Sequence, residues 1–312
     1  MRVLETDRLK LRWFGEHDAA LVLELMNEPS WIANIGDRGL RTVEDARAWI
    51  ASKFVTSYWH RGHGLWAVER KSDGVLVGMC GLLERDTLPH IDVGYALFPR
   101  FCGQGYAREA TRACLEYGRD ILGKRRILAI VWPKNGPSIR VLESVGMVAL
   151  GERLLPGEEA PSAVFARGES ADEAAKERDP QLEIDDLVRR FFRAFSNRDG
   201  LATIASVPSL FLPEAVVTIV KPAVPRGLEV VSVRDFVVPR AELLQNGRVT
   251  DFGEEEVSSK TEILGHLAQR STHYRKAGNL DGVPFAGGGE KRFQLVLTKG
   301  GWKIAALAWE DT

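Results

Sequence analysis

The sequence is poor in cysteine, in long hydrophobic runs and in net charge. Its three cysteines, Cys80, Cys102 and Cys114, are too few for a disulfide framework and are not spaced like metal ligands, so we expect reduced thiols and no metal site. No apolar run approaches the ~20 residues of a membrane span, so no membrane partner is expected. The N-terminus also lacks the apolar stretch of a secretory signal, which makes the cytoplasm the expected location.

Neither sign of charge dominates the chain. Its 312 residues include 42 lysines and arginines and 43 aspartates and glutamates, for a formal net charge of −1. A nucleic-acid-binding protein usually carries a basic surface, so nucleic acid is not the expected principal partner. The hydrophobic content of 45% is ordinary for a globular protein.

The length and one polar segment predict two domains. A chain of 312 residues exceeds the usual size of a single domain. The segment RGESADEAAKERDPQ, residues 167–181, is charged, free of aromatic residues, and separates two regions that each contain strand and helix patterns. We therefore expect one domain at residues 1–168, a linker at 169–181 and a second domain at 182–312.

The first region predicts a mixed sheet. A strand at residues 8–13 precedes a helical pattern at 17–26, and Thr42 offers the N-cap of a second helix. Strand patterns at residues 65–70, 75–84 and 91–98 then follow one another, before a βαβ unit. Consecutive antiparallel strands that lead into a parallel pair are typical of a mixed sheet in an α+β domain.

A two-glycine turn is the most informative motif of the sequence. Residues 100–107, RFCGQGYA, lie between the strand pattern at 91–98 and a helical pattern at 107–121. Gly103 and Gly105 allow positive φ and close approach of a ligand to the backbone. Successive N–H groups ahead of a helix can bind an anion, so the turn predicts a phosphate site.

This turn resembles the pyrophosphate loop of the GNAT superfamily of acetyltransferases, whose pattern is Arg/Gln-x-x-Gly-x-Gly/Ala. Three more segments resemble the branch that acts on ribosomal proteins and small amines: LETDRL at residues 4–9, DVGYAL at 92–97 and NGPSIRVLESVGM at 135–147. The resemblance covers about the first half of the chain and implies a sheet with a splayed central strand, with acetyl-CoA as acyl donor and an amine as acceptor.

The resemblance also implies which residues contact the donor. Backbone groups of the central strand would hold the pantetheine arm, and those of the turn would hold the pyrophosphate. In the third segment, the amide of Asn135 would contact the cofactor and the hydroxyl of Ser138 would lie near the sulfur. These expected cofactor-binding residues are Val93, Gly94, Tyr95, Arg100, Phe101, Cys102, Gly103, Gln104, Gly105, Tyr106, Ala107, Asn135 and Ser138.

Four residues are candidates for the chemistry. By resemblance, the backbone near Tyr95 would stabilise the oxyanion and Ser138 would protonate the leaving thiolate, although Asn135 and Ser138 could equally serve only as helix caps. Asp92 and His90 precede Gly94 on the same strand face and could act as general base. Their alternative interpretations are a solvated strand carboxylate and a histidine at a loop edge, and Glu84 is a lesser candidate for the base.

Several further residues of the first region are of types that could serve other roles. Cys102 lies in the anion-binding turn, but no base partner is identifiable for an acetyl-cysteine mechanism. His60 and His63 lack further metal ligands and are better read as surface or acceptor-site residues. The aromatic residues Trp31, Trp49 and Tyr58 could line an acceptor pocket or pack in the core, and the identity of the acceptor stays open.

The second region predicts an α+β domain. Residues 182–196 form a helical stripe of apolar residues, and strand patterns occur at residues 216–220, 230–238, 292–298 and 302–309. The opening helix and the closing hairpin resemble SnoaL-like domains, which share a cone with a curved antiparallel sheet. This architecture serves enzymes, binding modules and dimerisation units alike, so the resemblance does not transfer a function. We favour a binding role or a dimerising role, as in a homodimer, over an active site of its own. The titratable residues His266, His273, Asp235, Asp251 and Glu254 to Glu256 cannot be placed together, and the acidic run is interpreted as a solvated face.

Three functions remain open on sequence grounds. The first is an acetyl-CoA-dependent N-acetyltransferase that acetylates a primary amine of a small molecule or a protein N-terminus in a ternary complex, with an accessory C-terminal domain. The second is an acyl-CoA-binding sensor or scaffold without turnover. The third is a bifunctional protein whose C-terminal cone has an isomerase or hydrolase site.

Overall fold

A computed structural model describes residues 1–170, 172–173, 179–198, 200–221 and 227–311. Two compact units account for the chain, Met1–Tyr58 with His63–Lys176 and Trp59–Gly62 with Glu177–Thr312. The expected linker at residues 169–181 lies in large part outside the described residues. None of the described helices is both long enough and apolar enough to cross a membrane.

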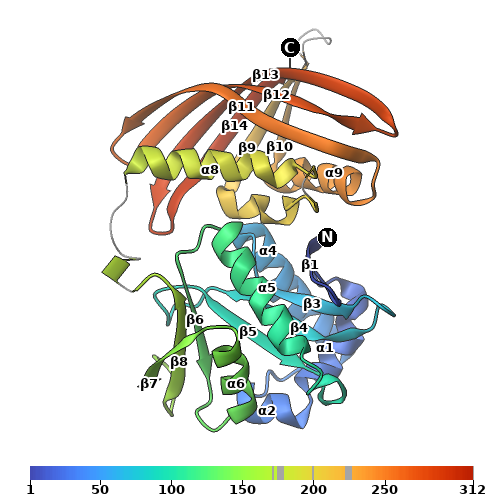
Figure 1. Ribbon diagram of the computed structural model, residues 1–312, viewed down its shortest axis with the longest axis vertical. Coiled ribbons are helices and arrows are strands. Elements are labelled where there is room, and N and C mark those ends of the chain that lie inside the picture. The colour runs from blue at the N-terminus through green and yellow to red at the C-terminus, as the bar shows by residue number, and fades with distance from the viewer. Residues whose placement is uncertain (171, 174–178, 199, 222–226, 312) are drawn as a thin grey trace. The chain divides into compact units, whose positions relative to one another are not determined.

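The first unit is built on an eight-stranded mixed sheet (Figure 1). Its strands are antiparallel to their neighbours except for the central pair β5 and β6, which is parallel. In spatial order they are β1 (Arg2–Glu5), β2 (Leu9–Arg12), β3 (Leu65–Arg70), β4 (Leu76–Leu83), β5 (Asp92–Leu97), β6 (Arg126–Val131), β8 (Ser162–Gly168) and β7 (Val148–Arg153). The mixed sheet predicted for this region is confirmed.

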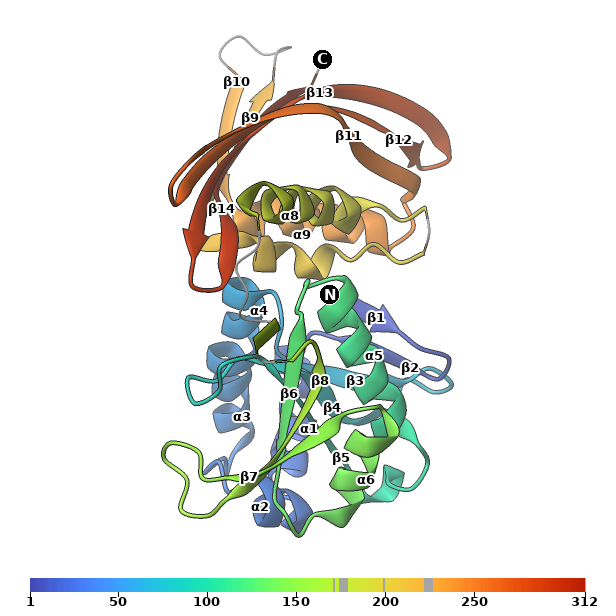
Figure 2. The same ribbon diagram turned by 60° about the vertical axis from the view of Figure 1, so that its left-hand side comes forward.

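Helices cover both faces of this sheet. Figure 2 shows α1 and α3 on one face and α5 and α6 on the other. The helices are α1 (Ala19–Met26), α2 (Pro29–Ile35), α3 (Val43–Trp49), α4 (Thr56–Arg61), α5 (Tyr106–Asp120) and α6 (Gly136–Ser144). Thr42 caps α3 as expected, because its hydroxyl accepts the N–H of Asp45.

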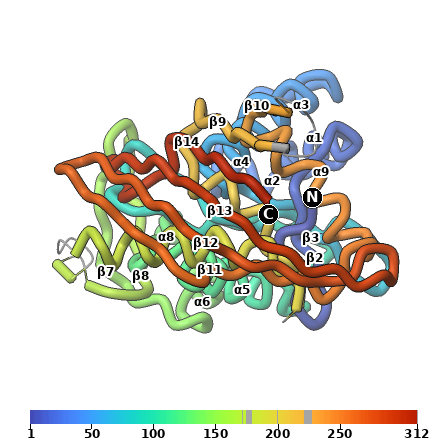
Figure 3. The backbone as a smooth tube through the Cα atoms, turned by 90° about the horizontal axis from the view of Figure 1, so that it is seen from above, coloured from blue at the N-terminus to red at the C-terminus, as the bar shows by residue number. Residues whose placement is uncertain are grey.

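The second unit is a curved six-stranded sheet with helices α8 (Pro180–Phe195) and α9 (Val233–Gln245) on its concave side (Figures 1 and 2). Seen from above in Figure 3, the long strands run side by side. In spatial order the strands are β10 (Gly227–Ser232), β9 (Phe211–Lys221), β14 (Gly301–Asp311), β13 (Val283–Thr298), β12 (Leu267–Leu280) and β11 (Val249–Leu264). The β9 and β14 pair is parallel and the others are antiparallel.

Phenylalanine rings hold α8 on this sheet. The ring centroid of Phe191 lies 5.3 Å from those of Phe195 and Phe293, and 6.1 Å from that of Phe211. All four side chains are buried. Aromatic pairs at these separations contribute beyond their buried area, so the predicted apolar stripe of α8 is the centre of this core.

Part of the sequence prediction for this unit is wrong. The strand expected at residues 230–238 ends at Ser232, and α9 starts at the next residue. The hydroxyl of Ser232 accepts the N–H of Asp235 at 3.1 Å, which caps the helix. The β-branched and aromatic residues of this stretch suggested a strand, but the cap decides the local conformation. The long, mostly polar strands β11 and β12 were not predicted either.

The Phe191→Ala substitution tests the importance of this core. It removes a ring from the centre of the cluster and should lower the free energy of unfolding of this unit by about 3–5 kcal/mol. The matched control is Leu182→Ala on the same helix, where the side chain is exposed and the expected loss is about 0.5 kcal/mol or less. Urea-dependent hydrogen exchange of peptides from α8 and β13 reports this unit separately from the first. Equal effects of the two substitutions would contradict the assignment.

Candidate active site

The central strands of the first unit separate immediately after they meet. Asp92 of β5 and Leu128 of β6 form the one register pair between these strands, supported by a hydrogen bond from the Leu128 N–H to the Ile91 carbonyl at 2.9 Å. The opposite edge of β5 pairs with β4 along its whole length, from Asp92 to Leu97. Beyond Asp92, the edge of β5 that faces β6 is therefore open, and its backbone groups can bind a ligand.

The two-glycine turn follows this open edge. Gly103 and Gly105 have φ values of +76° and +82°, the left-handed region that favours glycine, and Gly105 is the N-cap of α5. Within the described part of the chain, no acceptor bonds the N–H groups from Gly103 to Ala107. Unpaired N–H groups at a helix N-terminus, together with the helix dipole, form a site for an anion.

Residues near the N-terminus of the chain brace this turn. Arg8 donates to the Gln104 carbonyl at 3.0 Å and to a carboxylate oxygen of Glu109 at 2.7 Å, and its guanidinium lies 4.7 Å from the Tyr106 ring. Thr6 also donates to Glu109, in the first turn of α5. Burial alone would raise the pKa of Glu109, but the hydrogen bonds from Thr6 and Arg8 outweigh it and lower the pKa. The LETDRL segment thus positions the turn, a role that its sequence pattern did not reveal.

The polar side chains within the turn are also used for bracing. Arg100 forms an ion pair with Glu24 of α1 at 2.6 Å, and its guanidinium stacks 4.1 Å from the Phe98 ring. The Gln104 amide donates to the Arg100 carbonyl at 3.2 Å. Neither side chain is needed to bind an anion, because the backbone of the turn presents the donors.

The start of α6 brings two hydroxyl groups together. The Asn135 side chain accepts the N–H of Ser138 at 3.2 Å and caps the helix. The hydroxyl oxygens of Tyr95 and Ser138 lie 2.6 Å apart, and the Tyr95 hydroxyl donates to the Ser138 carbonyl at 3.0 Å. Burial raises the pKa of Tyr95 to about 12. Asn135 therefore has the capping role, whereas the hydroxyl of Ser138 is directed to Tyr95.

Of the two candidate bases, only Asp92 lies on β5. His90 precedes the strand, so the expectation that both share one strand face is wrong for His90. Asp92 and Tyr95 are three positions apart on a strand, so their side chains leave opposite faces. Asp92 is buried and accepts a hydrogen bond from the Arg85 guanidinium at 2.9 Å. Burial raises the pKa of Asp92, and Arg85 opposes this shift. Burial lowers the pKa of the half-buried His90, and the positive charges of Arg126, Arg125 and Lys124 lower it further.

Comparison with known proteins identifies the family. Residues 8–148 match the family described as "Acetyltransferase (GNAT) domain". The chain is 34% identical over 155 residues to the uncharacterized protein YkkB of Bacillus subtilis, an alignment that covers 46% of this chain and 84% of that protein. The chain belongs to the GNAT acetyltransferase family.

Two other similar proteins bear the acetyltransferase name. The uncharacterized N-acetyltransferase YnaD of Bacillus subtilis is 30% identical over 144 residues, covering 46% of this chain and 81% of that protein. A crystal structure of a GNAT-family acetyltransferase from Bacillus anthracis aligns with 27% identity and a TM-score of 0.46, covering 54% of this chain and 98% of that chain. The expected enzyme class is confirmed: the GNAT domain makes the protein an acetyl-CoA-dependent acyltransferase.

The site geometry fits coenzyme A as the donor. Its pyrophosphate needs a group of N–H donors, which the turn from Gly103 to Ala107 presents. Its pantetheine arm carries amides that need backbone partners, which the open edge of β5 could supply next to that turn. The thioester would then lie where Tyr95 and Ser138 meet.

The other candidates from the sequence have structural roles. Burial raises the pKa of the Cys102 thiol, whereas a nucleophilic thiolate needs a lowered pKa. His63 is buried, with a ring nitrogen 2.9 Å from the Leu82 carbonyl oxygen. Among the described residues, no group of three or more His, Cys, Asp or Glu side chains is arranged to hold a metal ion.

Of the three aromatic residues proposed for the acceptor pocket, two are buried and one is half-buried. Tyr58 is fully buried and stacks on Trp13 with a centroid distance of 4.7 Å, so it belongs to the core. Trp31 is buried, and its indole N–H donates to the Gly36 carbonyl at 3.1 Å. Trp49 is half-buried on α3. Tyr58 therefore gives no support to the hypothesis of an acceptor pocket.

The Arg8→Ala substitution should weaken binding of coenzyme A about 5- to 30-fold, because it removes the hydrogen bonds that position the turn and Glu109. Calorimetric titration with coenzyme A measures the change. Arg119→Ala is the matched control, since Arg119 is an exposed arginine at the far end of α5 that pairs with Asp120. Unchanged affinity in Arg8→Ala would show that the turn keeps its conformation without this brace.

Proposed function

We propose that the protein is an N-acetyltransferase that transfers the acetyl group of acetyl-CoA to a primary amine by direct attack in a ternary complex. The amine belongs to a small molecule or to a protein N-terminus. The observation that carries the proposal is the open edge of β5, which has the anion-binding turn at one end and the hydroxyl pair of Tyr95 and Ser138 beside it. The name of the related N-acetyltransferase YnaD supports an amine as acceptor.

Backbone groups do most of the donor binding in this proposal. The N–H groups of Gly103 to Ala107 hold the pyrophosphate, because those of Phe101 and Cys102 already donate to the carbonyls of Phe98 and Pro99. The backbone of Val93, Gly94 and Tyr95 holds the pantetheine arm and the thioester carbonyl. A preorganised donor at the developing oxyanion contributes about 3–4 kcal/mol to lowering the barrier. Holding the two reactants in line supplies a further part of the rate.

The reaction moves one proton and exchanges one bond. The amine nitrogen attacks the carbonyl carbon, and the C–N bond forms as the carbonyl oxygen takes up negative charge. The C–S bond then breaks and the sulfur leaves as a thiolate. The proton lost from the amine nitrogen goes to the general base, and the thiolate is stabilised by the hydroxyl pair.

Tyr95 and Ser138 act on the leaving sulfur. The pKa of Tyr95 is raised to about 12 by burial, whereas an alkyl thiol titrates near ~8.5. A hydroxyl this weak in acidity keeps its proton, so it donates a hydrogen bond to the thiolate instead of protonating it fully. The hydroxyl oxygen of Ser138, the proposed acid, lies 2.6 Å from that of Tyr95. Ser138 therefore acts together with Tyr95 as a hydrogen-bond donor to the thiolate.

Asp92 is the proposed base and His90 the proposed relay to solvent. Because the Asp92 side chain leaves β5 on the face opposite Tyr95, the proton reaches Asp92 through water in this proposal. Asp92 is the residue of β5 that pairs with β6, so it lies at the point where the two strands separate. Its pKa is raised by burial, which makes it a stronger base than an exposed aspartate. The lowered pKa of His90 leaves this ring neutral at pH 7 and able to accept a proton.

For the second unit we propose a SnoaL-like cone domain at residues 182–312, joined to the acetyltransferase domain at 1–168. The curved six-stranded sheet with α8 on its concave side supports this fold. Its proposed role is accessory, in ligand binding or dimerisation. Analytical ultracentrifugation that finds only monomers over the micromolar range would contradict dimerisation.

A panel of amines tests the function. With acetyl-CoA and primary amines, including peptides with free N-termini, the wild type should release thiol in an amine-dependent manner. Ser138→Ala and Tyr95→Phe should each lower kcat about 10- to 100-fold, and the double variant should lose little more, because the two hydroxyls act as a unit. Absence of release with every amine, despite binding of acetyl-CoA, would favour a sensor or scaffold.

A pH profile tests the base. Asp92→Asn should lower kcat/KM about 100-fold and remove the acid limb that belongs to the base. Arg85→Gln removes the cation that opposes the raised pKa of Asp92, so the pKa rises further and the acid limb moves to higher pH. The same acceptor amine is used for every variant, so that the effect of its own ionisation on the pH profile cancels in the comparison. If His90→Gln instead abolishes the limb and Asp92→Asn does not, His90 is the base.

A further inference from the structure

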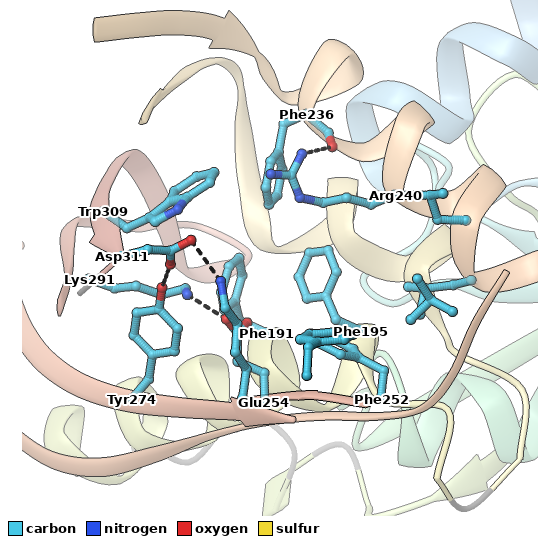
Figure 4. Close-up of a pocket in the computed structure, with 15 residues that line it drawn as sticks. Phe191, Phe195, Phe236, Arg240, Phe252, Glu254, Tyr274, Lys291, Trp309 and Asp311 are labelled. Atoms are coloured by element: carbon cyan, nitrogen blue, oxygen red, sulfur yellow. Dashed lines mark hydrogen bonds and ion pairs between the residues drawn. The ribbon is translucent and has the colours of Figure 1, made fainter. Parts of the chain in front are cut away.

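The second unit contains a cavity of about 220 Å³ between its helices and its curved sheet (Figure 4). Aromatic rings line it from both helices and from four strands, with Phe195 and Phe236 on the helix side and Trp309 on the sheet side. The ring of Phe236 lies 5.5 Å from Phe195 and 5.4 Å from Trp309, measured between centroids. Rings arranged in this way favour a flat apolar ligand.

The cavity also contains ionisable side chains, most of which are paired. The Lys291 ammonium is buried, lies 2.7 Å from a carboxylate oxygen of Glu254 and 3.1 Å from the centroid of the Tyr274 ring. Lys276 pairs with Asp311 at 2.7 Å, and the Tyr274 hydroxyl donates to the same carboxylate. Both carboxylates on the cavity wall are therefore paired with lysines, although Glu254, Asp311 and also Glu229 still act electrostatically on Arg240.

Arg240 is the cation that remains after this pairing. Three cations and two carboxylates line the cavity, namely Arg240, Lys276, Lys291, Glu254 and Asp311. Among the described residues, Arg240 has no carboxylate within ion-pair distance, and its hydrogen bond goes to the Phe236 carbonyl at 2.9 Å. A guanidinium has five N–H donors, so most of the donors of Arg240 have no protein acceptor in this part of the chain.

The surroundings of Arg240 partly remove its charge from water. Burial lowers the pKa of Arg240, but an arginine stays protonated in proteins. Its guanidinium lies 4.2 Å from the Phe236 ring centroid and 5.3 Å from that of Trp309, so two aromatic faces hold it in place. A fixed, partly desolvated guanidinium is suited to a carboxylate, which can accept two parallel hydrogen bonds.

We propose that this cavity binds a small molecule that has a flat apolar body and one carboxylate, and that Arg240 binds the carboxylate while the rings hold the body. A cavity of ~150 Å³ holds benzene, so this slightly larger one matches a bicyclic aromatic acid. The site is separate from the acetyl-CoA site in its residues, all of which belong to the second unit. It does not depend on the proposed acetyltransferase mechanism.

Titration of the full chain with two matched probes tests the proposal. The probes are 2-naphthoate and 2-naphthylmethanol, which have the same ring body but differ in charge, and calorimetry measures their dissociation constants. The wild type should bind the carboxylate about 10-fold or more tightly than the alcohol, because a hydrogen-bonded ion pair replaces a neutral contact. This comparison requires no variant, so it does not depend on the folding of a mutant.

Substitutions then assign the effect to Arg240. Arg240→Gln should weaken binding of 2-naphthoate about 10- to 100-fold and change that of 2-naphthylmethanol less than about twofold. Arg240→Lys keeps the charge but loses the planar fork, so its loss should be intermediate. The matched control Arg193→Gln, an exposed arginine of α8, should bind both probes like the wild type. Melting curves check that each variant is folded.

Three results would overturn the proposal. The first is that 2-naphthoate does not bind the wild type at millimolar concentration. The second is that the wild type binds the acid and the alcohol equally. The third is that a folded Arg240→Gln variant loses both probes to the same extent, which would make Arg240 a structural residue of the cavity instead of the anion-binding one.

Discussion

The separation of β5 from β6 is the constraint on which the site depends. Two adjacent parallel strands normally satisfy each other's backbone groups along their length, and here they pair at Asp92 and Leu128 alone. The edge that this leaves open needs hydrogen-bond partners, and a ligand with its own amides can provide them. The end of that edge sets the position of three elements of the site, namely the turn after β5, the helix α5 and the start of α6. The side chains of Arg8, Glu109 and Arg100 hold the turn while its backbone stays available.

The second unit buries charged side chains inside its concave sheet. Residues alternate between the two faces of a strand, so Glu254 and Glu256 point to one side and Glu255 to the other. Glu254 meets the buried Lys291, Glu256 meets the buried Arg270, and Glu255 forms an exposed pair with Arg275. The interpretation of this acidic run as a solvated face is therefore wrong for two of its three residues. Removing one partner of a buried pair would leave an uncompensated charge, so the two members of each pair depend on each other.

Patterns local in sequence were predicted well. The strands at residues 65–70 and 92–97 and the helix at 106–120 lie within one or two residues of their predicted bounds, because periodicity and the glycine turn specify them locally. The start of α9 was missed, because its cap of Ser232 on Asp235 lies inside an apolar run that reads as a strand. The strands β11 and β12 were also missed in the sequence prediction, because their many polar residues show no apolar alternation over most of their length.

By itself, the sequence determined the family, the two-glycine turn and the residue types available for chemistry, because glycine positions and motif spacing are local properties of the chain. Only the tertiary structure decided which of those residues meet. Tyr95 and Ser138 are 43 positions apart and touch, whereas Asp92 lies near Tyr95 in sequence and leaves the opposite face of the strand. Arg240 and Lys291 showed no signal at all in the sequence, since burial and pairing depend on neighbours from distant strands and helices. The physical reason is that side-chain environment is a property of packing, which brings remote segments together and excludes water from between them.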